Sequence, residues 1–158
     1  AFEESIRINP AQDTTLLNLA LLSKSPNDKI YYAQKALAAN PRYGKAYDLM
    51  IQTLYSQGKV GDALSLFPQL IELEKHNPNH HLNYGALLAE TGQFESALKQ
   101  YRLALNHSAQ DADIHYGTAL IYIQLNMREQ ATKHLLRAIE LNSHPHAISL
   151  LQSINDTQ

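Results

Sequence analysis

Eight histidines are the residues of this chain whose type could support metal chemistry. His76, His80 and His81 cluster at one place, and His144 and His146 cluster at another. A zinc site needs three or four ligands that converge on one ion, with further groups that hold each ring. An Asn-Pro pair between His76 and His80 breaks the helix that would place both rings on one face. We therefore expect neither a metal site nor another cofactor.

The common local patterns of catalytic sites are also missing from the sequence. It contains no glycine-rich phosphate loop, no G-x-S-x-G and no H-E-x-x-H. It has no cysteine, which excludes disulfides, thiolate zinc sites and a cysteine nucleophile. The carboxylates are scattered over faces predicted to be exposed. We predict that this chain has no catalytic residues and is not itself an enzyme.

Length and composition indicate a folded domain with a small net charge. The 158 residues are 44% hydrophobic and 18% charged, and the formal net charge is −2. A chain of this length buries a sizeable core, and its charge argues against disorder and against binding to nucleic acid. No run approaches the roughly 18 apolar residues of a membrane-spanning helix. The sequence indicates no particular compartment.

Similar residues recur every 34 positions, and the structure of this repeat determines where any binding residues lie. Glycine or asparagine marks the end of one helix in each copy, because both tolerate the left-handed conformation that terminates helices. A small alanine near the start of the next helix lets two backbones approach closely. The matching columns are Gly58, Gly92 and Asn126; Ala63, Ala97 and Ala131; Phe67, Tyr101 and Leu135; Leu70, Ala104 and Ala138; and Tyr47, His81 and His115. Both halves of each copy are therefore predicted to be helical.

The pattern resembles a tetratricopeptide repeat (TPR), and residues 81–105 carry the clearest copy. In that copy His81 stands at the usual Trp place, Tyr84 and Gly85 at the Leu-Gly place, and Ala97 and Tyr101 at the Ala-x3-Phe places. The chain departs from the family in having no Trp and in placing Ile51 where a small Gly is usual. The resemblance implies an all-α fold, a right-handed α-solenoid of stacked antiparallel helix pairs. A generic antiparallel helical bundle is the alternative.

The repeat divides the chain into one array with two atypical ends. The first full copy is expected to be short, because Pro10 and Pro41 are closer together than one repeat period, with the loss in the turn before a Ser25 N-cap. Pro68 predicts a kink in its helix or a late helix start near Ser65. The expected parts are an orphan second helix at 1–10, a short repeat at 11–43, repeats at 44–78, 79–111 and 112–145, and a capping helix at 146–158.

In this family the first helix of each pair lines a concave groove, which implies where a ligand binds. Asn18 and Asn83 are placed to hold the backbone of an extended peptide through their amides. Leu17 and several other apolar residues are expected to be exposed on this lining, as in contact surfaces. The candidate peptide-binding residues are Asn18, Leu21, Gln52, Tyr55, Leu82, Asn83, Tyr116, Leu120 and Ile123. The wider lining adds Thr14, Leu17, Lys45, Asp48, Asn79, Ala86, Glu90, Asp113 and Gln124.

One subgroup of the family grips the C-terminal carboxylate of chaperone tails with a Lys/Arg and Asn clamp. Here Leu17, Asp48, Leu82 and Tyr116 stand at the places of the cations. A carboxylate needs charge-assisted donors to offset its desolvation. An apolar or amphipathic segment of a partner protein is therefore the more plausible ligand.

Three functions follow from this sequence. The first is a protein-interaction scaffold that binds a partner segment in its groove. The second is the recruiting arm of a longer enzyme, such as a glycosyltransferase or another transferase, because the chain starts at Ala1 without Met and resembles an excerpt. The third is self-association through the apolar edge of the orphan helix at 1–10.

Overall fold

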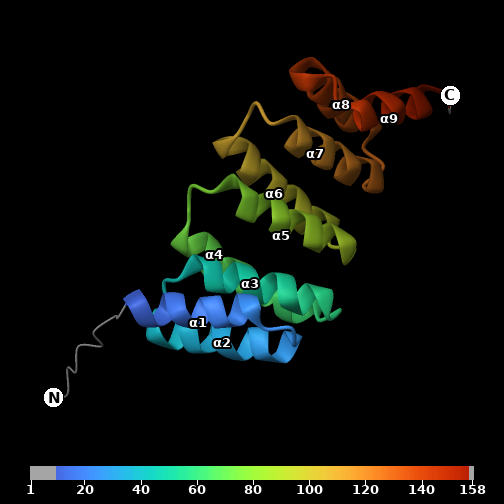
Figure 1. Cartoon of the computed structure of the whole chain (residues 1–158). Helices are drawn as coiled ribbons and strands as arrows, with labels where there is room; N and C mark the ends of the chain where they lie inside the picture. The colour runs from blue at the N-terminus through green and yellow to red at the C-terminus, as the bar shows by residue number, and fades with distance from the viewer. Residues whose placement is uncertain (1–9, 157–158) are drawn as a thin grey trace. The chain divides into compact units, whose positions relative to one another are not determined.

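In a computed structural model of the chain, the described residues 10–156 form nine α-helices and no strand (Figure 1). The first helices of the pairs are α1 (Pro10–Leu22), α3 (Gly44–Ser56), α5 (Pro78–Glu90) and α7 (Ala112–Gln124). The second helices are α2 (Pro26–Ala39), α4 (Val60–Leu73), α6 (Phe94–His107) and α8 (Arg128–Asn142), and α9 (Pro145–Asp156) follows them. Most of the predicted orphan helix at 1–10 lies outside the described residues, and Pro10 begins α1.

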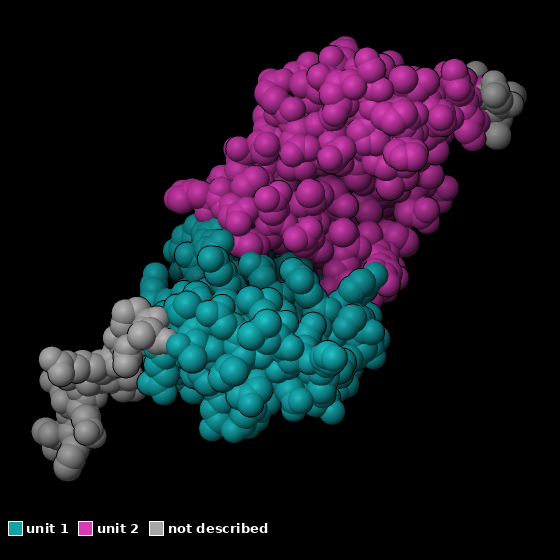
Figure 2. Space-filling view, viewed as in Figure 1, with its two compact units in different colours: residues 1–75 teal, residues 76–158 magenta. Residues whose placement is uncertain are grey.

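The chain divides into two compact units, residues 1–75 and 76–158, coloured separately in Figure 2. In unit 1, α1 packs on α2, α2 on α3 and α3 on α4. In unit 2, each helix from α5 to α9 packs on the next. Three residues join the two helices of every pair, which makes the pairs antiparallel hairpins. The predicted all-α fold of stacked helix pairs is confirmed within each unit.

The first pair has the same period as the others, which differs from the expectation of a short repeat. Helices α1, α3, α5 and α7 begin at Pro10, Gly44, Pro78 and Ala112, so their starts are evenly spaced at the repeat period. The α1–α2 turn is as long as the later turns, so nothing is missing from it. Pro10 begins a helix, whereas Pro41 lies in the loop after one, so the two prolines do not occupy equivalent places.

The turns within the last three pairs share one backbone structure. Gly58, Gly92 and Asn126 have φ of 73°, 76° and 56°, the left-handed conformation predicted for this column. In each turn the following N–H bonds a carbonyl five residues earlier, as in the bond from Lys59 N to Leu54 O at 2.9 Å. This Schellman pattern satisfies carbonyls that the helix end leaves unpaired.

Small residues of the repeat form the core, as their columns predict. The predicted alanines Ala63, Ala97 and Ala131 are all completely buried. They allow close helix packing, while larger residues such as Leu70 and Leu135 fill the space around them.

Two local features show how single residues fit this pattern. Ser25 caps α2 by accepting a bond from Asp28 N, as predicted. Helix α4 begins at Val60 and continues through Pro68, so the late start predicted near Ser65 is wrong. Pro68 is exposed, so water can bond the Leu64 carbonyl that lacks a partner in the helix.

Candidate functional site

The first helices of unit 2 form a surface with an apolar pocket of about 460 Å³. We call the surface formed by α5 and α7 the first-helix face of unit 2. Helices α5 and α7 contact each other, and side chains of α6 lie beneath them. The pocket is lined by Ala86, Ala89, Phe94, Tyr101, Gly117, Leu120, Ile121 and Gln124.

Two helical glycines make room for the ring that floors this pocket. A Cβ added to Gly85 would lie 2.8 Å from Cδ2 of Tyr101, and one added to Gly117 would lie closer still to Cε1. Both distances are too short for carbon atoms, so only glycine allows the ring to lie between α5 and α7. Burial raises the pKa of the Tyr101 phenol, which keeps it uncharged. The pocket therefore has a fixed, neutral aromatic floor.

The first helices of unit 1, α1 and α3, form a smaller pocket of about 230 Å³. Its lining combines leucines with Lys45, Asp48 and Gln52. Leu17 also lines it but is only 6% exposed, so the expected exposure of Leu17 is wrong. Leu17 lies one repeat period before Ile51, in the column that packs against the second helices, which explains its burial.

The nine predicted binding residues differ in exposure and in what they line. Leu21, Tyr55 and Leu120 are 56%, 46% and 38% exposed. Asn18, Gln52 and Asn83 are exposed, whereas Leu82, Tyr116 and Ile123 are half-buried. Leu21 and Gln52 meet in the unit 1 pocket, and Leu120 lines the unit 2 pocket. Ile123 lines a third pocket, with Asn126, Arg128 and Ile154. The other five, Asn18, Tyr55, Leu82, Asn83 and Tyr116, line none of these three pockets.

Sequence reasoning missed the residues beneath this face. Phe94 and Tyr101 belong to a second helix, which the resemblance assigns to the opposite side of the pair. The available signal was glycine inside predicted helices, at Gly85 and Gly117, which is costly unless a neighbour approaches closely.

A histidine and an aspartate connect α7 to α9 beside the unit 2 face. His144 Nδ1 accepts the backbone N–H of Ala147 at 3.3 Å, so Nε2 carries the proton and donates to Asp113 Oδ1 at 3.1 Å. The His144 ring also stacks on Tyr116, with 4.5 Å between centroids. Both ring nitrogens are occupied, so this His-Asp pair positions α9 and offers no free nitrogen to act as a base.

A second histidine pair joins α7 to α8. His115 Nε2 lies 3.2 Å from the Ala109 carbonyl, which can only accept, so this nitrogen carries the proton. His115 Nδ1 then accepts from His134 Nδ1 at 3.0 Å. Burial, His115 and Arg102 together lower the pKa of His134. Among residues 10–156, no group of three or more His, Cys, Asp or Glu side chains could hold a metal ion.

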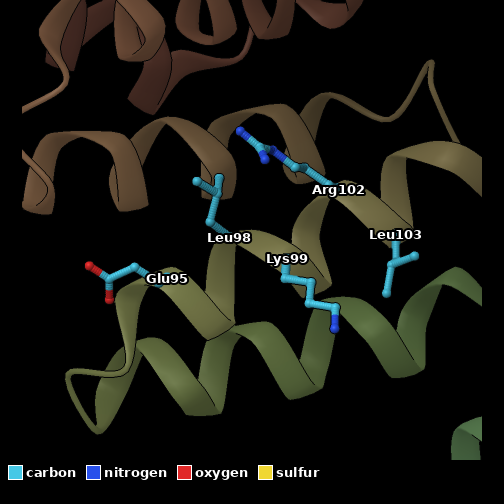
Figure 3. A pocket seen from close by; sticks show the side chains of 5 residues that line it. All are labelled: Glu95, Leu98, Lys99, Arg102 and Leu103. Atoms are coloured by element: carbon cyan, nitrogen blue, oxygen red, sulfur yellow. The ribbon is translucent and has the colours of Figure 1, made fainter.

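Helix α6 carries a further pocket, of about 380 Å³, on its own surface (Figure 3). Figure 3 shows all five lining side chains rising from this one helix. They are Glu95, Leu98, Lys99, Arg102 and Leu103. Arg102 also donates to the Tyr122 hydroxyl at 3.0 Å. This surface mixes both signs of charge, unlike the uncharged pocket between α5 and α7.

Comparisons with known families and sequences place the chain among repeat proteins. Models of the tetratricopeptide repeat family match residues 54–115 and 112–145. The chain is 32% identical to the TPR repeat-containing thioredoxin TTL4 of Arabidopsis thaliana over 110 residues, which are 68% of this chain and 16% of that protein. It is 31% identical to intraflagellar transport protein 70A1 of Mus musculus over 119 residues, which are 69% of this chain and 18% of that protein. It thus spans less than a fifth of either relative.

Solved structures of MamA resemble the fold. A MamA RS-1 double mutant covers 92% of this chain and 84% of its own, at a TM-score of 0.83 and 17% identity. MamA 41-end from Desulfovibrio magneticus RS-1 covers 93% of this chain and 97% of its own, at a TM-score of 0.74 and 16% identity. Among residues 10–156, no helix is both long and apolar enough to cross a membrane.

Proposed function

Because the chain belongs to the tetratricopeptide repeat family, we propose that this interaction scaffold binds an apolar or amphipathic segment of a partner protein on its first-helix surfaces. The observation that supports this proposal most directly is the unit 2 pocket between α5 and α7. It combines exposed Leu120 with the rigid Tyr101 floor, so an apolar side chain can bury there without disturbing the fold.

The chemistry of the pocket favours an apolar anchor over a carboxylate. Its lining contains no Lys or Arg, and Gln124 is its only side chain with a hydrogen-bonding amide. Exposed Asn83 lies on the same helix as Ala86 and Ala89 and can bond the backbone of a bound segment. We therefore retain the residues named for this surface as candidate contacts, with Leu120 as the first to test.

Leu120→Asp tests the binding surface, and Leu136→Asp is its matched control. Leu136 lies on α8, is 47% exposed and lines none of the pockets described above, so the same change is made away from the first-helix face. Twelve-residue peptides selected from a random display library on the wild-type chain serve as probes. Their affinities are measured by fluorescence anisotropy, and far-UV circular dichroism checks that both variants remain folded.

We expect Leu120→Asp to weaken binding at least tenfold, because a charge would enter an apolar pocket. Leu136→Asp should change affinity by less than about twofold. Equal affinities for both folded variants would show that the selected peptides bind elsewhere, and the proposal would fall.

The second function, a recruiting arm within a longer enzyme, is favoured by one comparison. The relative named a thioredoxin is matched over only 16% of its length, so a TPR segment there accompanies a much longer chain. On this reading the array binds and has no catalytic activity of its own. The test measures turnover by the full-length natural protein with and without Leu120→Asp. If the array recruits the substrate, the variant should have a higher KM and an unchanged kcat.

A further inference from the structure

We propose that the first-helix face of unit 2 selects segments that carry a lysine or arginine two to four residues from their apolar anchor. This inference rests on the proposed function, because it names the chemistry of the segment bound there. The observation that carries it is the separation of charge between the helices of unit 2.

Every Lys and Arg of unit 2 belongs to a second helix. Lys99 and Arg102 are on α6, and Arg128, Lys133 and Arg137 are on α8. Helices α5, α7 and α9 contain no Lys or Arg at all. The first-helix face therefore carries acidic side chains without a Lys or Arg on its own helices to pair with them.

Asp113 is the carboxylate best placed to meet a bound segment. Its side chain is 77% exposed, and it lies four residues before Gly117 and seven before Leu120, on the same side of α7 as the pocket. At 1.5 Å per residue, Asp113 is about 10 Å from Leu120 along the helix. An extended segment covers that distance in about three residues, which sets the spacing that we propose.

The neighbours of Asp113 leave its negative charge available. His144 Nε2 bonds one carboxylate oxygen of Asp113, Oδ1, while His144 Nδ1 is used by the backbone N–H of Ala147. Asp111, which caps α7 by accepting from Asp113 N and Ile114 N, adds a second carboxylate at this end of the helix. Arg137 of α8 reaches the loop before α7, where it donates to Gln110, and it pairs with Glu140 at 3.0 Å.

The unit 1 pocket and the α6 pocket lack this combination. On the unit 1 face, Lys45 lines the same pocket as Asp48, so both signs are present. On α6, Glu95 is accompanied by Lys99 and Arg102. Arg128 lies beyond the opposite end of the unit 2 pocket, beside Ile123 at the end of α7, and so does not face Asp113.

The test uses the library-selected peptides and the variant Asp113→Asn. The amide oxygen of Asn can still accept from His144, so the variant removes the charge and keeps the bond that holds α9. Glu95→Gln, on α6, removes the same charge from unit 2 without altering the first-helix face. Each peptide is also made with its Lys or Arg replaced by Gln. The wild type and the two variants are each measured with both forms of the peptide, at 50 and 300 mM salt.

We expect the selected peptides that are sensitive to Leu120→Asp to contain Lys or Arg two to four residues from an aromatic or large aliphatic residue. Asp113→Asn should weaken them about two- to fivefold at low salt, as for a partly exposed ion pair, and less at high salt. Glu95→Gln should have no such effect. The loss should vanish for the peptides in which Gln replaces the basic residue.

Two other outcomes separate this inference from the proposed function. Peptides that respond to Leu120→Asp but not to Asp113→Asn, and that show no enrichment in Lys or Arg, would overturn the inference and leave the proposed function standing. Peptides that respond to neither variant would overturn both.

Discussion

Replacing Gly117 with alanine tests whether the close approach of Tyr101 is a real packing constraint. In an open helical position, Gly→Ala stabilises by about 0.5 to 1 kcal/mol, because alanine has less backbone freedom to lose. At Gly117 the new methyl would collide with the Tyr101 ring, which is itself buried against Gly85. Overpacking of this kind costs about 1 to 3 kcal/mol. The net expectation is a loss of up to about 2 kcal/mol.

Gly61→Ala is the matched control for this prediction. Gly61 lies inside α4, and an added Cβ there would have no atom within 4 Å, so the variant should be more stable than the wild type. Thermal unfolding is followed by calorimetry, and each variant is compared with the transition of its own unit. For a unit of this size, 1 kcal/mol shifts Tm by about 4 to 8 °C. The two substitutions should therefore shift Tm in opposite directions.

The double variant Gly117→Ala with Tyr101→Leu identifies the atoms responsible. Leucine already fills the equivalent place of the next repeat at Leu135. Removing the ring should relieve the collision. The double variant should therefore lose less stability than the sum of the losses in the two single variants. If Gly117→Ala proves as stabilising as Gly61→Ala, the ring does not occupy the space between the glycines, and the account of the pocket floor is wrong.

Two further predictions concern pH and the turns. Because the folded state lowers the pKa of His134, folding favours the neutral ring, so stability should be highest above the unfolded value of about 6.5 and should fall as the pH drops through the folded pKa. Urea unfolding between pH 8 and pH 5 would measure this, and His134→Gln should have a weaker pH dependence; equal slopes would contradict the assignment. In the turns, Asn126→Gly should stabilise and Gly92→Ala should destabilise, each by about 1 kcal/mol, because both positions have left-handed φ. Urea midpoints test this pair, and shifts in the same direction would count against it.

The sequence was sufficient to predict the helix pairs and their core, because those depend on a repeated pattern. The alanine at position 97 and the glycine at position 92 each have counterparts one repeat period away, and each pattern has one physical explanation. The first pair was harder to interpret. Asp13 occupies the position of Tyr47 and His81 in later copies, and it is buried with a 2.7 Å hydrogen bond from Asn40. Because an aspartate replaces the aromatic residue there, a comparison of residue types does not detect this copy of the repeat.

The candidate binding surface was less predictable than the fold, for a geometric reason. One helical position turns the side chain by about 100°, so an error of one residue in phase moves it from the surface into the core. Leu17 was placed in the groove lining on this basis and is buried. The glycines at 85 and 117 indicate a close neighbour, but they do not identify it as Tyr101, because the approach of Tyr101 to α5 and α7 is a distance between helices rather than a pattern along one.

The turns within the last three helix pairs are closed by hydrogen bonds between main-chain atoms. Their outward side chains therefore contribute little to the structure. Lys59 and Met127 are exposed there, and neither uses its side chain to cap a helix. Since the chain contains no cysteine, a single thiol introduced at either residue would be unique in the protein. A dye attached at residue 59 would report on unit 1, and one at residue 127 on unit 2, so the melting of each half could be followed by its own signal.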